Sequence, residues 1–423
     1  VTIKYNTFGA LDWVSNYNGY AGVSQGQDIP ISICVDDLGN SYVTGNSNVW
    51  TGNLDDILTV KYNSSGDTVW TNRYNGPLSV GDQAYSIKVD ELGNVYVAGY
   101  VDANSNSGTR DFCTIKYNST GVLQWFGRYN GPDNKVDEAR ALDVDPLGNV
   151  IVTGYSESTS SGVDYATVKY NSVGVQQWAS RFTYTNSSET AADIVSDSSG
   201  NCYVTGTSRN NLNWYGCLTI KYNPLGDTLW VKNEHPTNFE SGSVIVIDNS
   251  KNVYIAGLSY NDLYTIKYDS LGTKIWEDMY RQLANSQQFI ADIAVEPTIG
   301  ILYVAGSFLY SAQNADYLIL RYSSVTGIED EKVFTPNNLI LNQNYPNPFN
   351  PYTIIKYSIP YSDIVNIKVF DILGREVAVL LNEFKPAGTY SIEFNADRFA
   401  SGVYFYQLNA GSYVETKKMI LMK

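Results

Sequence analysis

A phrase that returns at intervals of roughly fifty residues constrains this chain more than any other feature. It consists of Lys-Tyr-Asn, then a glycine turn, then a tryptophan. Copies begin at Lys4, Lys61, Lys116, Lys169, Lys221 and Lys267, and a partial copy stands at Arg321. The tyrosines of successive copies are 57, 55, 53, 52, 46 and 54 residues apart. A repeat of this length in a strand-rich sequence predicts units that cannot bury their faces alone and therefore pack against one another.

Each repeat has the pattern of four short antiparallel strands. Within residues 137–182, four apolar segments are separated by a variable Ser/Gly-rich loop and by two tight turns, Asp-Pro-Leu-Gly at 145–148 and Asn-Ser-Val-Gly at 171–174. Four antiparallel strands joined by hairpins form one blade of a β-propeller, and neighbouring blades cover both of its faces. We therefore predict an all-β chain with a β-propeller over residues 1–326.

The repeats predict six blades from this chain. First-and-second strand pairs are expected near residues 31–46, 86–100, 140–155, 192–207, 243–258 and 290–306. The last copy, Asp316 to Tyr322, has no tryptophan strand after it. We expect the N-terminal strand with Trp13 to supply that fourth strand, because strands from both ends would close the ring and remove its free edges. The strand at Thr2–Tyr5 is then left over, and the natural ring has seven blades if about half a repeat is missing upstream.

Charge and composition exclude several classes of partner. The net charge is −15, and residues 339–423 hold 8 Lys/Arg against 7 Asp/Glu, so residues 1–338 carry −16. An acidic body disfavours nucleic acid and anionic membrane surfaces, because phosphate binding needs a basic patch. No apolar run is long enough for a membrane span. The four cysteines form no CxxC pair, which argues against a zinc knuckle.

The repeats resemble the SBBP-type β-propeller repeat. The resemblance covers about residues 1–325 and rests on three segments: the Asp-x-x-Gly-Asn turn, the Tyr-Val-Thr/Ala-Gly strand that follows it (203–206 and 254–257), and the Asp-x-x-Thr-x-Lys-Tyr-Asn strand. It implies the propeller fold, and it indicates almost nothing about activity.

A second unit follows the repeats. A short polar linker spans residues 327–340, and residues 341–423 read as a small β-sandwich of short strands. Val365, Ile367 and Val369 alternate with polar residues, which is typical of a strand with one buried face.

This unit resembles the type A C-terminal sorting domain of the bacterial type IX secretion system. The matching segments are Asn-Tyr-Pro-Asn-Pro-Phe-Asn-Pro at 344–351, Val-Phe-Asp-Ile-Leu-Gly-Arg-Glu-Val at 369–377, Ala-Ser-Gly-Val-Tyr-Phe-Tyr at 400–406 and the terminal 417–423. The resemblance implies export across the outer membrane, contact with the secretion machinery, release or attachment at the surface, and an upstream Sec signal peptide. The sorting-signal residues that it implies are Pro346, Pro348, Phe349, Gly374, Gly402 and Lys423.

Two sets of aspartates recur with the repeat, and we interpret both as structural. The first opens the turn between strands one and two, where its side chain can accept hydrogen bonds from the turn backbone. Its members are Asp36, Asp90, Asp145, Asp197 and Asp248. The second stands five residues before the repeat lysine, and we expect it to accept hydrogen bonds from a neighbouring blade. Its members are Asp56, Asp111, Asp164, Asp262 and Asp316.

A third acidic set stands eight residues before the turn aspartate, at the start of the innermost strand. Its members are Asp28, Asp82, Asp137, Glu189 and Glu240, with Gln288 in the sixth place. Five carboxylates around one mouth of the central channel would repel one another unless they were solvated or shared a cation. Bound Ca²⁺ or a basic ligand is one hypothesis, and the alternative is that each acid caps a neighbouring backbone N–H. No other cofactor is expected.

Trp50 and Trp214 lie in variable loops and have no counterpart in other repeats, so they are candidates for stacking on a sugar or peptide. We interpret the chain as a secreted or surface-displayed, non-catalytic binding or adhesion protein whose partner is an extracellular glycan or protein. Two alternatives stay open: an extracellular propeller hydrolase or lyase with a metal at the channel mouth, and a structural surface-layer component. Like residues repeated around an axis favour binding over catalysis, because catalysis needs unlike groups in one place.

Overall fold

The computed structural model describes residues 1–6, 9–19, 27–48, 55–76, 81–102, 109–183, 188–209, 215–234, 239–259, 262–280, 287–311, 314–323, 339–359, 363–385, 388–411 and 413–423. The chain divides into two compact units, Val1–Ser324 and Val325–Lys423. The described part of both units is built from β-strands, with one short 3₁₀ turn, η1 (Pro132–Asn134).

Five four-stranded antiparallel sheets form complete blades in the first unit, each with its strands in chain order. Their strands are β3 (Gln27–Val35), β4 (Ser41–Asn48), β5 (Asp56–Tyr62) and β6 (Thr68–Tyr74); β7 (Gln83–Val89), β8 (Val95–Asp102), β9 (Arg110–Tyr117) and β10 (Leu123–Tyr129); β11 (Asp137–Val144), β12 (Val150–Ser158), β13 (Gly162–Tyr170) and β14 (Gln176–Phe182); β15 (Ser188–Ser196), β16 (Cys202–Arg209), β17 (Tyr215–Tyr222) and β18 (Thr228–Glu234); and β19 (Phe239–Ile247), β20 (Val253–Ser259), β21 (Asp262–Tyr268) and β22 (Lys274–Tyr280).

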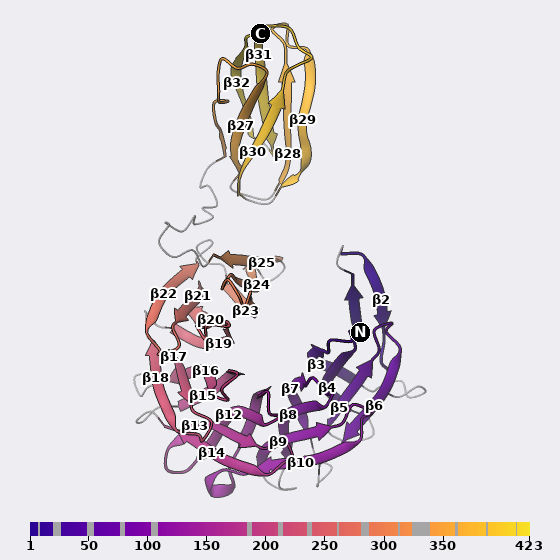
Figure 1. Cartoon of the computed structure of the whole chain (residues 1–423), viewed down its shortest axis with the longest axis vertical. Coiled ribbons are helices and arrows are strands. Elements are labelled where there is room, and N and C mark those ends of the chain that lie inside the picture. The colour runs from indigo at the N-terminus through magenta and orange to yellow at the C-terminus, as the bar shows by residue number, and fades with distance from the viewer. Residues whose placement is uncertain are drawn as a thin grey trace. The chain divides into compact units, whose positions relative to one another are not determined.

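Two incomplete sheets flank these blades. β1 (Thr2–Tyr5) pairs with β2 (Leu11–Ser15), and the last sheet holds β23 (Gln287–Val295), β24 (Leu302–Ser311) and β25 (Asn314–Tyr322). The sheets follow one another in chain order around an arc with the first strand of each complete blade on its inner side (Figure 1). The β-propeller and the strand order within its blades are therefore confirmed.

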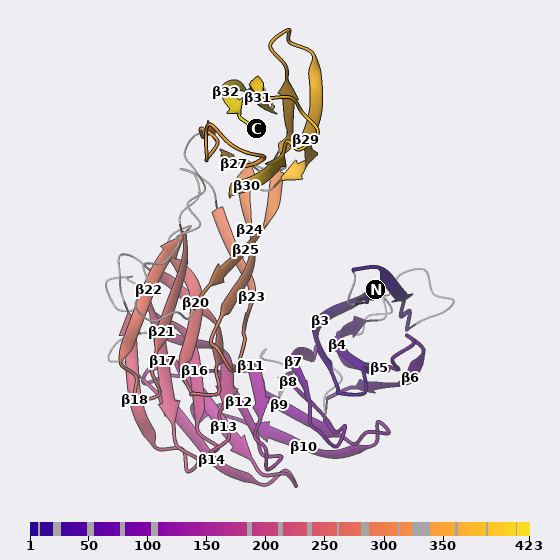
Figure 2. The same cartoon turned by 45° about the horizontal axis from the view of Figure 1, so that its top comes forward.

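The expected ring closure through Trp13 is wrong for the described residues. The strand that carries Trp13, β2, pairs with β1 in the register Lys4↔Trp13, which matches Lys61↔Trp70 in the next blade. β1 and β2 therefore act as third and fourth strands of a blade that precedes β3. In both views the two ends of the arc lie apart (Figures 1 and 2). The sequence pattern could not reveal this, because β1 and β25 both have the pattern of a third strand. Either of them could therefore pair with the strand that carries Trp13.

The repeated tryptophans join each blade to the next. Trp125 Nε1 donates a hydrogen bond to the carbonyl oxygen of Ser172, in the last turn of the following blade, at 3.2 Å. The Trp125 ring also lies 5.9 Å, centroid to centroid, from the ring of Tyr170 in that blade. Trp13, Trp70 and Trp178 make the same pair of contacts. Large aromatic side chains supply much of the buried area at such interfaces, which explains why the repeat phrase ends on tryptophan.

A glycine in each second strand faces a β-bulge in the first strand. In the second blade the register between β7 and β8 shifts between Ala84 and Ser86, directly opposite Gly99. A Cβ atom on Gly99 would lie 1.8 Å from the carbonyl oxygen of Gln83. The equivalent glycines Gly45, Gly154, Gly206 and Gly306 face the same kind of obstacle. The glycine of the Tyr-Val-x-Gly phrase is therefore required by the close approach of two backbones.

The second unit contains two antiparallel sheets. One has the order β26 (Ile340–Leu341), β27 (Tyr352–Ile359), β30 (Gly388–Asn395); the other has the order β29 (Glu376–Lys385), β28 (Asp363–Phe370), β31 (Gly402–Ala410), β32 (Tyr413–Leu421). One buried cluster draws on both sheets, with Ile355 and Phe394 from the first and Ile367, Tyr406 and Met419 from the second. The alternating pattern predicted for Val365, Ile367 and Val369 is present, since all three are fully buried.

Candidate functional site

The turn aspartates are structural, as predicted. The Asp36 carboxylate accepts hydrogen bonds from the backbone N–H of Leu38 and Asn40 through Oδ1, at 3.0 and 2.9 Å. Through Oδ2 it accepts from the Asn40 amide at 2.8 Å and the Tyr42 hydroxyl at 2.9 Å. Burial raises the pKa of Asp36, but the hydrogen bonds from Asn40 and Tyr42 outweigh it, and the pKa is lowered overall. This carboxylate is therefore ionised at neutral pH.

Three of the aspartates before the repeat lysine pair within their own blade, so the expected blade-to-blade role is wrong for Asp56, Asp111 and Asp164. Asp56 pairs with Arg73 at 2.8 Å, and Asp111 pairs with Arg128. In each case the arginine lies on the fourth strand, directly beside the third strand that carries the aspartate. Asp164 pairs with Arg181 in the same way. An arginine in the fourth strand of these three blades was the signal in the sequence that would have indicated this pairing.

The acids at the start of the innermost strand bind backbone N–H groups of the preceding blade. Asp137 Oδ2 accepts from Gly131 N at 2.6 Å, and Asp28 Oδ2 accepts from Gly19 N at 3.0 Å. Asp82 accepts from Gly76 N of the preceding blade and also from Asp102 N in its own blade, the latter at 3.2 Å. All three glycines belong to a Tyr-Asn-Gly segment that follows the fourth strand of the blade before. This arrangement favours the alternative in which each acid caps a backbone N–H.

The remaining positions of this set are Glu189, Glu240 and Gln288. Glu189 and Gln288 are buried, and Gln288 Oε1 accepts from Leu263 N at 3.2 Å. Glu240 lies on β19, and its side chain is outside the described residues. In the described part of the chain, no three His, Cys, Asp or Glu side chains gather in a way that could hold a metal ion. The calcium hypothesis stays a prediction, to be tested by calorimetric titration of Ca²⁺ into the wild type and the Asp82→Asn and Asp137→Asn variants.

The buried carboxyl of Asp82 predicts a specific dependence of stability on pH. Burial raises its pKa from 3.8 to about 6, against the lowering effect of the Gly76 and Asp102 N–H groups. Because the folded-state pKa lies above the unfolded value, the stabilising contribution of this group is complete below 3.8 and is lost as the pH rises through about 6.

We therefore expect the stability of the wild type, relative to the Asp82→Asn variant, to fall as the pH rises from about 4 to about 7. Urea unfolding of both proteins across this range measures the difference. The exposed Glu91→Gln substitution is the matched control for loss of one carboxylate. A free energy of unfolding of the wild type that stays constant or rises with pH, relative to that of Asp82→Asn, would contradict the assignment.

Two further acids were missed by the sequence analysis. Asp143 on β11 accepts a hydrogen bond from Ser196 N at 2.6 Å, and Asp193 on β15 accepts from Ile245 N at 2.9 Å. Each donor lies on the innermost strand of the next blade, whose inner edge has no ladder partner. Burial raises the pKa of Asp193 to about 6, while the hydrogen bonds from the backbone N–H groups of Ile245 and Ile194 oppose the shift. The position of Asp143 holds other residue types in the other repeats, and the position of Asp193 holds an aspartate in only one other repeat, at Asp292, so periodicity gave no clear signal.

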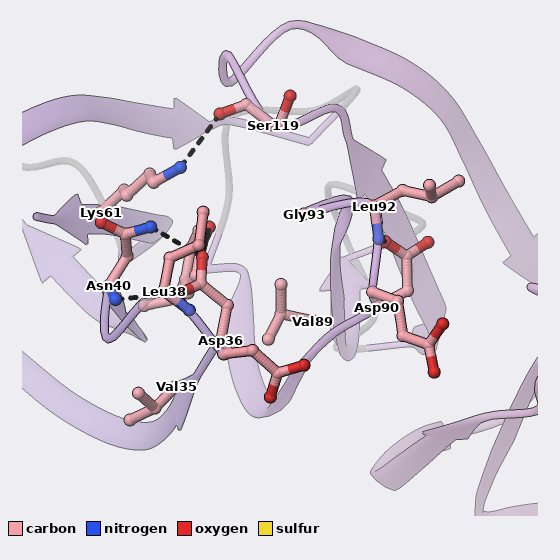
Figure 3. A pocket seen from close by; sticks show the side chains of 13 residues that line it. Val35, Asp36, Leu38, Asn40, Lys61, Val89, Asp90, Leu92, Gly93 and Ser119 are labelled. Atoms are coloured by element: carbon pink, nitrogen blue, oxygen red, sulfur yellow. Dashed lines mark hydrogen bonds between the residues drawn. The ribbon is translucent and has the colours of Figure 1, made fainter.

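A pocket of about 490 Å³ lies between the first and second complete blades (Figure 3). Two successive first turns, residues 36–40 and 90–93, form its opposite sides. Lys61 donates to the Ser119 carbonyl oxygen at 3.3 Å and lies over the Tyr42 ring, 5.0 Å from its centroid. Four carboxylates and one ammonium line the pocket, contributed by Asp36, Asp37, Asp90, Glu91 and Lys61. It is therefore suited to a cation.

The two candidate stacking residues, Trp50 and Trp214, lie outside the described residues. Their predicted contact with a sugar or peptide stays a prediction. Cys113, Cys202 and Cys217 are buried and unpaired, and Cys34 is half-buried and unpaired.

In the second unit, the proline-rich segment lies against the last strand. Phe349 is buried and pairs its backbone with β32, accepting from Met422 N and donating to the Ile420 carbonyl oxygen, each at 3.0 Å. The Asn347 side chain accepts from Ile420 N at 2.9 Å. The Pro346 carbonyl oxygen accepts from the Thr353 hydroxyl at 2.8 Å. The peptide bonds before Pro346 and Pro348 are both cis.

The other predicted sorting residues occupy turns and the chain end. Gly374 closes a turn with φ of 75° and donates to the Asp371 carbonyl oxygen at 3.0 Å. Gly402 begins β31 and pairs with Leu421 on β32. Lys423 donates from its backbone to Ser401 Oγ at 2.9 Å and from Nζ to the Asp397 carbonyl oxygen. The first and last segments of the predicted signal are thus parts of one folded surface around β32.

Two family models match the sequence. Residues 343–422 match the secretion system C-terminal sorting domain, and residues 20–49 match the β-propeller repeat of the SBBP type. The type IX sorting domain marks proteins that are exported to the cell surface or secreted, so export of this chain is established by its second unit. Among the described residues, no helix is long and apolar enough to cross a membrane.

Several solved structures are similar to this chain. PorZ of Porphyromonas gingivalis, described as an essential surface component of its type IX secretion system, is 13% identical with a TM-score of 0.41; the alignment covers 97% of this chain and 61% of PorZ. A Dyadobacter fermentans protein of unknown function is 10% identical with a TM-score of 0.43, covering 69% and 93%. The β-propeller domain of the Trilobed protease from Pyrococcus furiosus is 7% identical with a TM-score of 0.43, covering 80% and 91%. No curated protein matches the sequence.

Proposed function

We propose that this protein is a non-catalytic binding protein that acts at the cell surface or in the surrounding medium. Its second unit directs export, and its propeller holds the ligand, an extracellular protein or glycan. The observation that carries the proposal is the sorting domain at residues 343–422, joined in one chain to a propeller with a carboxylate-lined pocket.

The chemistry of the propeller supports binding over catalysis. The recurring acids make hydrogen bonds that hold turns and blades together, as Asp36 does in its turn and Asp137 does between blades. The recurring lysines likewise hold successive blades, as Lys116 does by donating to the Ser172 carbonyl oxygen at 3.1 Å. Groups engaged in this way are positioned by the repeat and are not gathered around one reacting atom.

The proposal is tested with the purified full chain on an array of extracellular glycans and peptides. We expect saturable binding to at least one class, with every probe recovered chemically unchanged. Absence of binding to every class would contradict the binding function. Cleavage of a bound probe, seen by mass spectrometry, would contradict the non-catalytic assignment and favour the hydrolase or lyase.

The role of the second unit is tested separately in a bacterium that has a type IX secretion system. Both chains are expressed behind the same Sec signal peptide; we expect the full chain to reach the surface or medium and a chain without residues 339–423 to remain in the periplasm. The Ile364→Ala variant is a control that should be exported like the full chain, because Ile364 is exposed and lies outside the predicted sorting signal. Equal export of the full and shortened chains would contradict the assignment.

A further inference from the structure

Elsewhere in this propeller, a lysine ammonium group already lies between the first turns of two successive blades. The first turn of a blade is the one that joins its strands one and two. Between the fourth and fifth complete blades, Lys251 Nζ lies 2.7 Å from Ser199 Oγ and 3.4 Å from Asp197 Oδ2. Asp197 also accepts from Asn201 Nδ2 at 2.8 Å and from the Tyr203 hydroxyl at 3.2 Å. A turn aspartate with these hydrogen bonds therefore still accepts an ion pair from a lysine.

The same geometry recurs in the pocket between the first two complete blades, without the lysine. Asp36 occupies the position of Asp197 and has the equivalent hydrogen bonds from Asn40 and Tyr42. Gly93 stands where the fifth blade has Lys251, counted from the turn aspartates Asp90 and Asp248. The space that Lys251 fills between the later blades is thus available to a ligand here.

The lining of the pocket matches a lysine side chain in both charge and polarity. Asp37 and Glu91 add two exposed carboxylates beside Asp36 and Asp90. Val35, Val89, Leu38 and Leu92 supply apolar surface at the sides, which suits the aliphatic stem of lysine. Figure 3 shows the two turns on opposite sides of the pocket, with Lys61 directed to Ser119.

We propose that this pocket binds a lysine side chain of an extracellular polypeptide, with its ammonium group placed against the Asp36 carboxylate as Lys251 is placed against Asp197. The inference rests on the proposed binding function and names its ligand class. An extended basic segment fits better than a free amino acid, because 490 Å³ is several times the volume of one lysine stem.

The test uses the full chain and two small probes, Nα-acetyl-L-lysinamide and its uncharged counterpart Nα-acetyl-L-norleucinamide. NMR titration is expected to show saturable binding of the lysine probe and at least tenfold weaker binding of the norleucine probe. Added salt should weaken the lysine probe further, since the interaction is between charges near the surface. Equal binding of the two probes would overturn the proposal.

A lysine built into the pocket should block it. Gly93→Lys places a side chain where Lys251 stands in the fifth blade, and the backbone tolerates it, because Lys251 itself has a φ of 61° and Gly93 a φ of 77°. We expect at least a tenfold loss of lysine-probe binding. Gly200→Lys, at the equivalent position two blades later, is the matched control, because it faces Asp145 and not a residue of the pocket, and it should bind as the wild type does. Unchanged binding by Gly93→Lys would overturn the proposal.

Two further variants keep the test decisive if Gly93→Lys folds poorly. Asp37→Asn combined with Glu91→Gln changes only exposed carboxylates and should weaken the lysine probe several-fold without lowering the melting temperature. Lys251→Gly removes the internal lysine and should add one binding site to the number found for the wild type. An unchanged stoichiometry would contradict the use of Lys251 as a model of the bound lysine. If the wild type binds a probe on the array but does not bind the lysine probe, the proposal for this pocket is rejected and the proposed binding function is retained.

Discussion

Replacing Gly99 by alanine is expected to destabilise the propeller by about 3–5 kcal/mol, the range of the most damaging single substitutions. The added Cβ atom would lie 1.8 Å from the Gln83 carbonyl oxygen and 2.8 Å from the Ala84 Cα atom. Both obstacles are backbone atoms of β7 at a bulge, so no change of side-chain rotamer relieves them. The strands must separate or the bulge must move, and either change breaks hydrogen bonds between β7 and β8.

Urea unfolding of the full chain, followed by tryptophan fluorescence, measures this loss. Gly162→Ala is the matched control, because its Cβ atom meets no heavy atom within 4 Å and only its φ of 82° opposes the substitution. We expect that control to lose about 1–2 kcal/mol, the cost of holding an alanine in the left-handed region. Equal losses for the two variants would show that the backbone contact at Gly99 is not the cause.

The second large effect is expected for Phe349→Ala in the sorting domain, with a loss of about 3–5 kcal/mol. Phe349 is 2% exposed and packs in the core of that unit, with its ring 6.1 Å from the ring of Phe394. Truncation leaves a cavity at the point where the proline-rich segment meets β32. Because the segment is held there by Phe349, we also expect reduced export of the variant.

Differential scanning calorimetry separates the two units if they unfold independently. The transition of the second unit should fall in temperature in Phe349→Ala, and that of the propeller should stay where it is. Ile364→Ala is a suitable control, because Ile364 is 63% exposed on β28 and its truncation opens no cavity. A lowered propeller transition in Phe349→Ala would contradict the division of the chain into two units.

Much of the fold could be predicted because the repeat carries its own turn chemistry. An Asp or Asn side chain that accepts backbone N–H groups and a glycine with positive φ define the hairpin turns, and the structure shows these features at Asp36 and Gly39 in a first turn and at Asn63 and Gly66 in a second. The tryptophan recurs with the same spacing, and Trp125 contacts Ser172 and Tyr170 of the next blade. Such features repeat with the backbone, so the spacing of residues is sufficient to reveal them.

The candidate site is different, because it depends on which residues meet across a blade boundary. Asp56 was expected to reach a neighbouring blade, and it pairs instead with Arg73 in its own blade. Asp82 and Asp137 were candidates for a cation site, and both accept backbone N–H groups from the blade before. A carboxylate has the same appearance in the sequence whether it binds a cation, an arginine or an amide.

The sequence by itself determined the propeller, the sorting domain and the turn roles of the repeated aspartates, since all of these follow from local backbone geometry and from periodic burial. Only the tertiary structure decided that β2 pairs with β1, that the inner acids cap neighbouring blades, and that Gly93 leaves open the space that Lys251 fills three interfaces later. Those outcomes depend on distances between residues some fifty positions apart, and such distances exist only once the blades have packed.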